Sequence, residues 1–264
     1  MVNLLSIIAL GFFLGMRHAT DPDHVIAVTT IVTRQRSVLK SAAIGAFWGV
    51  GHTLTIFAVG AAIILFDLVI PPRVGLSMEL SVGLMLIILG VMNVISFRRS
   101  IPEAEPGLQA GPTIHTHVHT HGDYVHSHPH THGADGHSHS HSIVWLDRLL
   151  GKTRVYQPLR PLLIGIVHGL AGSAAVALLV LTTIRSSRWA IAYLLVFGVG
   201  TIAGMMLITM SIASTFRLAG QSLKFSRRLA VASGLLSLAF GLVVAYHICI
   251  VDGLLTAHPH WTPR

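Results

Sequence analysis

Cysteine, acidic residues and charge in general are all scarce in this chain of 264 residues. Charged residues make up only 11% of it, whereas a water-soluble domain carries about a quarter, so a surface that faces water on all sides is excluded. Cys249 is the single cysteine, which excludes an internal disulfide and a metal site built from several thiolates. Hydrophobic residues reach 52%, and the composition therefore predicts an all-α membrane protein.

Six apolar stretches are long enough to cross the hydrocarbon layer as a helix, which takes about 20 residues. They lie at residues 3–32, 41–66, 78–97, 160–183, 189–213 and 229–251. The segment between the third and the fourth is polar and rich in Pro, Gly, Ser, Thr and His, so we expect a flexible loop there. The predicted organisation is a three-helix membrane unit (1–97), a loop (98–157) and a second three-helix unit (158–264).

Basic residues are unevenly distributed between the two ends of these helices. Thirteen lie on the side of the long loop: Arg34, Arg36, Lys40, Arg98, Arg99, Arg148, Lys152, Arg154, Arg160, Arg217, Lys224, Arg227 and Arg228. The other side has four: Arg73, Arg185, Arg188 and Arg264. Basic residues collect on the cytoplasmic side. We therefore expect a multi-pass protein of the cytoplasmic (inner) membrane, with both termini outside and the loop in the cytoplasm. The formal charge of +8 needs no nucleic-acid partner.

The two membrane units share short matches at a nearly constant offset. Gly15-Met16-Arg17-His18 matches Gly165-Ile166-Val167-His168, and Gly49-Val50-Gly51 matches Gly198-Val199-Gly200. Because each unit has three spans, an odd number, the second must be inverted in the membrane relative to the first. Two inverted repeats with a site near the midplane are a transporter architecture.

A polar segment interrupts the first span: Arg17-His18-Ala19-Thr20-Asp21-Pro22-Asp23-His24. Ionisable groups at membrane depth cost about 2.5–3.5 kcal/mol each, so something must compensate for them. Pro22 lacks a backbone N–H, and we expect the helix to break there, with Asp21 as N-cap and Asp23 in the first turn of the second half. Capping is one interpretation of both acids, but it leaves His18 and His24 unexplained. Imidazole and carboxylate ligands together suit Ni, Co, Zn or Fe.

Two further histidines extend this candidate site. His52 follows Gly49-Val50-Gly51, where small residues allow close helix approach and would let His52 reach the first span. His168 occupies the position in the second unit that His18 has in the first. Each has the alternative interpretation of a packed core histidine. The candidate intramembrane ligands are His18, Asp21, Asp23, His24, His52 and His168.

The polar segment with Val25 resembles the RHAxDxDH motif of the nickel/cobalt transporter family, and Gly51-His52-Thr53 is similar to that family's GHS/T motif. The resemblance covers two of the six spans and implies metal-selecting roles for His18, Asp23, His24 and His52. Many members of the family have eight spans. Six spans with a histidine-rich loop look more like the urease-accessory permease branch, and somewhat like the efflux branch, so the direction of transport stays open.

The loop holds eleven of the eighteen histidines, mostly alternating with Thr, Ser or Pro. Neutral imidazole binds Ni²⁺, Zn²⁺ and Cu²⁺, so we expect several weakly held ions here; the alternative is a solvated linker without a metal role. The candidate loop ligands are His115, His117, His119, His121, His126, His128, His130, His132, His137, His139 and His141.

The sequence as a whole predicts a secondary permease for Ni²⁺, with Co²⁺ as a second candidate substrate. It predicts neither an enzyme, since the chain has no HExxH, nor a prosthetic group. Uptake for urease or hydrogenase maturation is the first hypothesis, with the lipid membrane and cytoplasmic nickel chaperones as partners. The alternatives are a nickel/cobalt efflux permease and a membrane-anchored nickel chaperone or urease-assembly partner.

Overall fold

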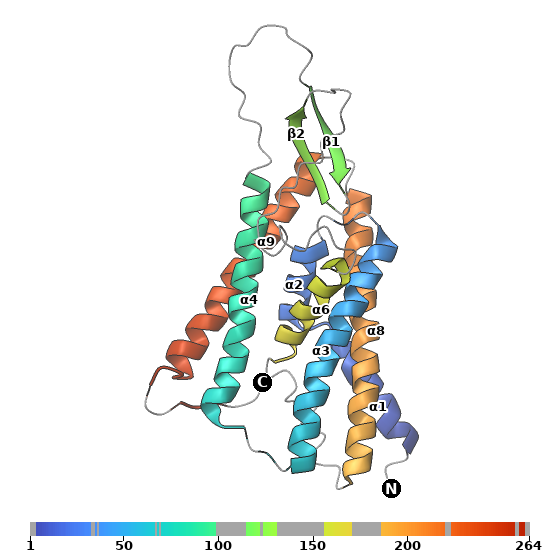
Figure 1. The fold of residues 1–264 in the computed structure, drawn as a ribbon, viewed down its shortest axis with the longest axis vertical. Coiled ribbons are helices and arrows are strands. Elements are labelled where there is room, and N and C mark those ends of the chain that lie inside the picture. Colours follow the sequence, from blue (N-terminus) through green and yellow to red (C-terminus); the bar gives the residue numbers. More distant parts are fainter. Residues whose placement is uncertain are drawn as a thin grey trace.

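The computed structural model describes residues 4–32, 35, 37–66, 68, 70–98, 115–121, 124–130, 156–170, 186–219, 223–256 and 259–261. Over these residues the chain forms a helical bundle with a small β-hairpin beyond one end (Figure 1). The helices are α1 (Leu4–His18), α2 (Pro22–Val32), α3 (Val38–Phe66), α4 (Pro72–Arg98), α6 (Tyr156–His168), α8 (Ser187–Ala219) and α9 (Leu223–Tyr246). The last of these continues as a short π-helix, η1 (His247–Val251).

Four of the described helices, α3, α4, α8 and α9 with η1, are long and apolar enough to cross a membrane. Only 22% to 44% of their apolar windows is buried inside the protein, so most of their apolar surface faces outward. Phe13, Leu54 and Val243 are among the large hydrophobic side chains that are more than half exposed. Such a surface is unfavourable in water and matches lipid. The prediction of a helical membrane protein is confirmed at this level.

The ends of the helices differ in places from the predicted spans. The first span is broken as expected, because α1 ends at His18 and α2 begins at Pro22. Helix α4 begins at Pro72, earlier than predicted, since proline is tolerated in a first helical turn. The predicted fourth span begins within α6, which ends at His168, and its remainder from 171 to 183 lies outside the described residues.

The hairpin is a difference from the expected loop without regular structure. Strands β1 (His115–His121) and β2 (Tyr124–His130) pair antiparallel, with His115 opposite His130 and His121 opposite Tyr124. Thr, Val and Tyr in these strands favour extended backbone, and Pro129 is tolerated because both strands of a two-stranded sheet are edge strands. The hairpin and the N-terminus lie at opposite ends of the molecule (Figure 1).

The helices pack in a pattern that encloses the ends of α1 and α6. Helix α3 lies against α8 and α4 against α9, while α1 contacts α8 and α6 contacts α3. Helices α2 and α6 lie in the middle of the bundle (Figure 1). As a result, His18 and His168, the last residues of α1 and α6, are 7% and 0% exposed. Two polar side chains at helix ends are thereby enclosed in a protein that presents an apolar exterior.

Candidate metal centre

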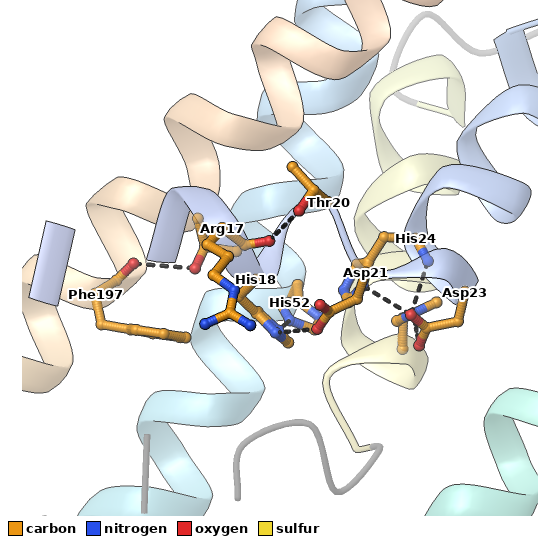
Figure 2. A network of polar contacts seen from close by, with 10 residues as sticks. Arg17, His18, Thr20, Asp21, Asp23, His24, His52 and Phe197 are labelled. Atoms are coloured by element: carbon orange, nitrogen blue, oxygen red, sulfur yellow. Dashed lines mark hydrogen bonds and ion pairs between the residues drawn. The ribbon is translucent and has the colours of Figure 1, made fainter. Parts of the chain in front are cut away.

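The break between α1 and α2 positions several of the candidate ligands. The chain leaves α1 through turn hydrogen bonds from Thr20 N–H to the Arg17 carbonyl (2.8 Å) and from Asp21 N–H to the His18 carbonyl (3.1 Å). Helix α2 then begins with Pro22, whose missing N–H would be unpaired in a first helical turn anyway. The break therefore places Asp21 beside His18, and Asp23 beside His24 at the start of α2 (Figure 2).

The two acids at the break have different roles from those expected of caps. The Asp21 carbonyl accepts the first α2 hydrogen bond, from Val25 N–H at 3.1 Å, as an N-cap residue does. The Asp21 carboxylate, however, accepts a hydrogen bond from Nδ1 of His18 at 2.9 Å. The expectation that the Asp21 side chain caps α2 is therefore corrected. The N–H of His24 is bonded instead by Asp23 Oδ1 at 2.9 Å. Asp23 thus satisfies the helix end and, as shown next, two imidazoles.

His18, His24 and His52 form a first group of three imidazoles. Nε2 of His18 and Nε2 of His52 are 2.9 Å apart, joined by a hydrogen bond between α1 and α3. The ring of His24 lies edge-on to both, with centroid distances of 4.7 Å to His18 and 4.9 Å to His52. One ligand atom from each of these side chains lies within 4.8 Å of the others. The group can hold a metal ion by geometry alone.

Asp23, His24 and His168 form a second group of the same kind. The Asp23 carboxylate accepts from Nδ1 of His24 at 3.1 Å and from Nε2 of His168 at 3.0 Å. The rings of His24 and His168 are 4.3 Å apart between centroids. His24 and His168 are fully buried, whereas 21% of the Asp23 side chain is exposed. The second group therefore contains the one ligand with some access to solvent.

Several nitrogens of this cluster are buried without a hydrogen-bond partner among the described residues: Nε2 of His24, Nδ1 of His52 and Nδ1 of His168. A buried polar atom left without a partner costs about 1–3 kcal/mol. When His24 and His168 donate to Asp23 through their other nitrogen, these atoms carry the lone pairs that metal ions bind. Their burial indicates a cluster built to receive a ligand rather than to pack.

Close contact between α3 and α6 brings His52 and His168 into range. A Cβ on Gly165 would collide with the Trp48 carbonyl oxygen, and one on Gly169 would lie 2.6 Å from the carbonyl oxygen of His52. Only glycine lets the two backbones approach in this way. His52 does reach His18 of the first span, as predicted, but Gly49 and Gly51 contact Ile202 of α8 and Leu162 of α6, so the expected packing of these glycines against the first span is wrong.

Two aromatic residues at the centre were missed by the sequence analysis. Trp48 lies 5.9 Å from His24 and 5.4 Å from His168, and Phe197 lies 5.5 Å from His18, as centroid distances. Both are buried. A signal was present for Trp48, because a residue four positions before His52 faces the same side of a helix.

The structure thus brings five of the six candidate intramembrane ligands, from α1, α2, α3 and α6, into two groups, while Asp21, between α1 and α2, belongs to neither group and contacts His18. Neutral imidazoles with one or two carboxylates are borderline ligands that favour divalent ions such as Ni²⁺, Co²⁺ and Zn²⁺. Of the loop histidines, seven lie in β1 and β2 as backbone positions, and His132, His137, His139 and His141 lie outside the described residues.

Comparison with known proteins gives one clear relative. The chain is 34% identical over 253 residues to the urease accessory protein UreH of Bacillus sp. (strain TB-90), and the match covers 96% of each chain. No family profile matches the chain, and no solved structure does. The match therefore spans nearly the whole of both chains.

Proposed function

The chain belongs to the family of the urease accessory protein UreH, and on this ground we propose that it is a permease that carries Ni²⁺ across the cytoplasmic membrane. The observation that carries the proposal is the cluster of four buried histidines and Asp23 inside a bundle with an apolar exterior. Buried ionisable groups in a membrane bundle mark ion pathways. The resemblance of residues 17–25 to the nickel/cobalt transporter motif supports the same substrate, with Co²⁺ as the second candidate.

Reciprocal contacts between the two units support the proposed inverted repeat. A Cβ on Gly51 would collide with the carbonyl oxygen of Leu162, and one on Gly200 with that of Phe12. Residues 12 and 51 of the first unit correspond to residues 162 and 200 of the second, at an offset of about 150, so each contact is the equivalent of the other with the units exchanged. The contacts of α1 with α8 and of α3 with α6 are related in the same way. Such exchange is what a twofold axis between equivalent units produces. Six spans in two inverted units, with α1–α2 as a broken span, fit this pattern.

Supply of nickel to urease maturation is the proposed purpose, with uptake as the direction. The relative's name states a role accessory to urease, and a histidine-rich cytoplasmic loop suits delivery to cytoplasmic nickel chaperones. A transporter of this kind has no catalytic residues and no prosthetic group. Measurement of ⁶³Ni accumulation in cells with and without the protein tests the proposal. Higher accumulation supports uptake, lower accumulation indicates efflux, and equal accumulation contradicts transport.

The first prediction concerns orientation. The excess of basic residues on one side places the termini outside and residues 98–157 in the cytoplasm. Cysteines at Ser138 and Thr262, each introduced alone after replacement of Cys249 by serine, are expected to react oppositely with a membrane-impermeant thiol reagent. Thr262→Cys should react in intact cells, and Ser138→Cys only after the membrane is opened. Reaction of Ser138→Cys in intact cells would reverse the proposed orientation.

A second prediction separates the permease from a membrane-anchored chaperone. Deletion of residues 113–141 should lower the number of Ni²⁺ ions bound per chain and leave most of the ⁶³Ni uptake, because the intramembrane ligands lie outside the deleted segment. Equilibrium dialysis measures the first quantity and cellular accumulation the second. Replacement of the same segment by Gly and Ser residues of equal length is the control for loop length. Complete loss of uptake in both variants would favour the chaperone.

A further inference from the structure

The ligands of the centre do not form one group but two that share a member. His18, His24 and His52 satisfy the distance condition together, and so do Asp23, His24 and His168. Among the described residues, the five side chains are not found as a single group within that limit. Bonds from a divalent ion to imidazole nitrogen are about 2.0–2.1 Å long, so two donors to one ion lie at most about 4.2 Å apart. In this arrangement one ion is held by either group, not by both at once.

His24 belongs to both groups, and its ring has two nitrogens. Nδ1 lies 3.1 Å from Asp23 Oδ1. Nε2 is buried and has no hydrogen-bond partner among the described residues. The ring centroid of His24 lies 4.7 Å from that of His18 and 4.9 Å from that of His52. A shared ligand lets an ion pass between two positions without ever losing protein contact.

We propose that the centre holds the divalent ion at two successive positions, one formed by His18, His24 and His52 and the other by Asp23, His24 and His168. The proposal rests on the proposed transport function and adds to it a second position and a role for His168. The ion moves between the positions by exchanging ligands around His24.

The two positions differ in the membrane unit that supplies their ligands. His18, His24 and His52 all lie in the first unit, whereas His168 ends α6 in the second. A small movement of the second unit relative to the first therefore opens or closes the second position, through His168, and leaves the first position intact.

The positions also differ in access. Asp23 has 21% of its side chain exposed, whereas the side chains of His18 and His24 are 6% and 0% exposed and His52 is fully buried. The second position therefore contains the most exposed of the five ligands, Asp23, whereas all three ligands of the first position are buried.

An ion that moves between two positions must bind them with similar affinity, because an ion held much more tightly at one of them would stay there. Two such positions predict an unusual pattern of variants. Loss of one position halves the total binding constant, so affinity falls only about twofold, while transport through both positions is lost. In a single site, loss of one ligand should cost roughly tenfold or more in affinity. His52→Gln and His168→Gln are thus expected to bind within about threefold of wild type, and His24→Gln at least about a hundredfold more weakly.

Trp48 provides a reporter that the loop histidines do not disturb. Its ring lies 5.9 Å from His24 and 5.4 Å from His168, close enough for a bound Ni²⁺ ion to quench its fluorescence. The full chain with Trp145, Trp189 and Trp261 replaced by phenylalanine retains Trp48 alone of its four tryptophans. Titration of this purified chain with Ni²⁺ gives the affinity of the centre, and proteoliposomes made from it give ⁶³Ni transport. Alanine variants at the same three positions are measured beside the glutamine variants, in case one set does not fold.

The expected result is near-normal quenching affinity in the His52 and His168 variants together with transport below about a tenth of wild type. A loss of affinity as large as that of the His24 variant, in either of them, would mean one indivisible site and overturn the proposal. Wild-type transport by the His168 variants would overturn it as well. If the affinities follow the expected pattern but wild type moves no ⁶³Ni, the two positions stand and the transport function fails.

Discussion

Uptake of ⁶³Ni by cells that express His24→Ala is expected to fall below about a hundredth of the wild-type rate. His24 is a member of both ligand groups. Removal of a residue that only hydrogen-bonds a metal ligand already lowers metal affinity or activity about 10–100-fold, so removal of a ligand itself should lower them at least as much. Asp23→Ala should act as strongly, since its carboxylate contacts His24 and His168 at 3.1 and 3.0 Å. Membrane insertion should be retained, because removing a buried polar group makes insertion easier. Uptake is compared at equal amounts of protein in the membrane.

Asp21→Asn is the matched control for these variants. Asp21 belongs to neither ligand group, its side chain is 43% exposed, and the amide oxygen of an asparagine can still accept a hydrogen bond from Nδ1 of His18. We expect uptake within severalfold of wild type, the residual loss reflecting the weaker partner for Nδ1 of His18. Near-normal uptake by both His24→Ala and His52→Ala would contradict the centre, and loss in Asp21→Asn as complete as in His24→Ala would move the substrate ligand to Asp21.

Gly165→Ala is expected to lower the thermal midpoint of the purified protein by about 4 to 10 °C. The new Cβ would collide with the Trp48 carbonyl oxygen and force α6 away from α3, and overpacking of this kind costs about 1–3 kcal/mol. Since His168 follows on the same helix, uptake should fall with stability. Thermal unfolding in detergent, followed by the monodisperse fraction in gel filtration, measures the first effect.

Gly83→Ala is the control for the same change of side chain. Its Cβ would meet a Val244 methyl group at 3.2 Å, and a side chain can shift where a backbone carbonyl cannot. Because alanine is also the better helix former by about 1 kcal/mol, we expect an unchanged or slightly higher midpoint. Equal destabilisation by both substitutions would show that the α3–α6 contact has no special sensitivity.

The broken helix and its ligands were predictable from the sequence because their causes are local. Pro22 cannot donate its hydrogen bond wherever the helix lies, so the break follows from one residue. Gly49 and Gly51 likewise predicted a surface beside His52 where another helix can come close. The expected neighbour of these glycines was the first span, and this was wrong, because glycines mark a close contact without naming the partner. In the structure α8 contacts Gly49 and α6 contacts Gly51.

The role of His168 could not be settled in this way. Its contact with Asp23 joins residues 145 positions apart and depends on α6 ending inside the bundle. The division of the ligands into two groups depends on the same geometry, because it is decided by distances of a few ångströms between four helices. The position of Asp21 as N-cap was predicted from its neighbour Pro22, but the contact of its side chain with His18 was not.

The histidine hairpin was missed because the segment lacks the apolar alternation of an ordinary strand. Histidine alternates with Thr, Val, Ser and Pro, so both faces read as polar and composition favours a loop. Threonine and valine at every second position still favour extended backbone, and a two-residue connection is short enough for a hairpin. A separate unit of secondary structure at the end of the bundle follows from these local preferences.

The second ligand group contains a single carboxylate, and this fixes the charge of the loaded centre. Neutral imidazoles add no charge, so a divalent ion held beside Asp23 leaves one positive charge without a counter-charge within the group. In a medium of low dielectric constant such an excess raises the energy of the bound state. Two carboxylates would cancel the charge and make a tighter store. With one, electroneutrality within the group is incomplete, which favours release of the ion over storage.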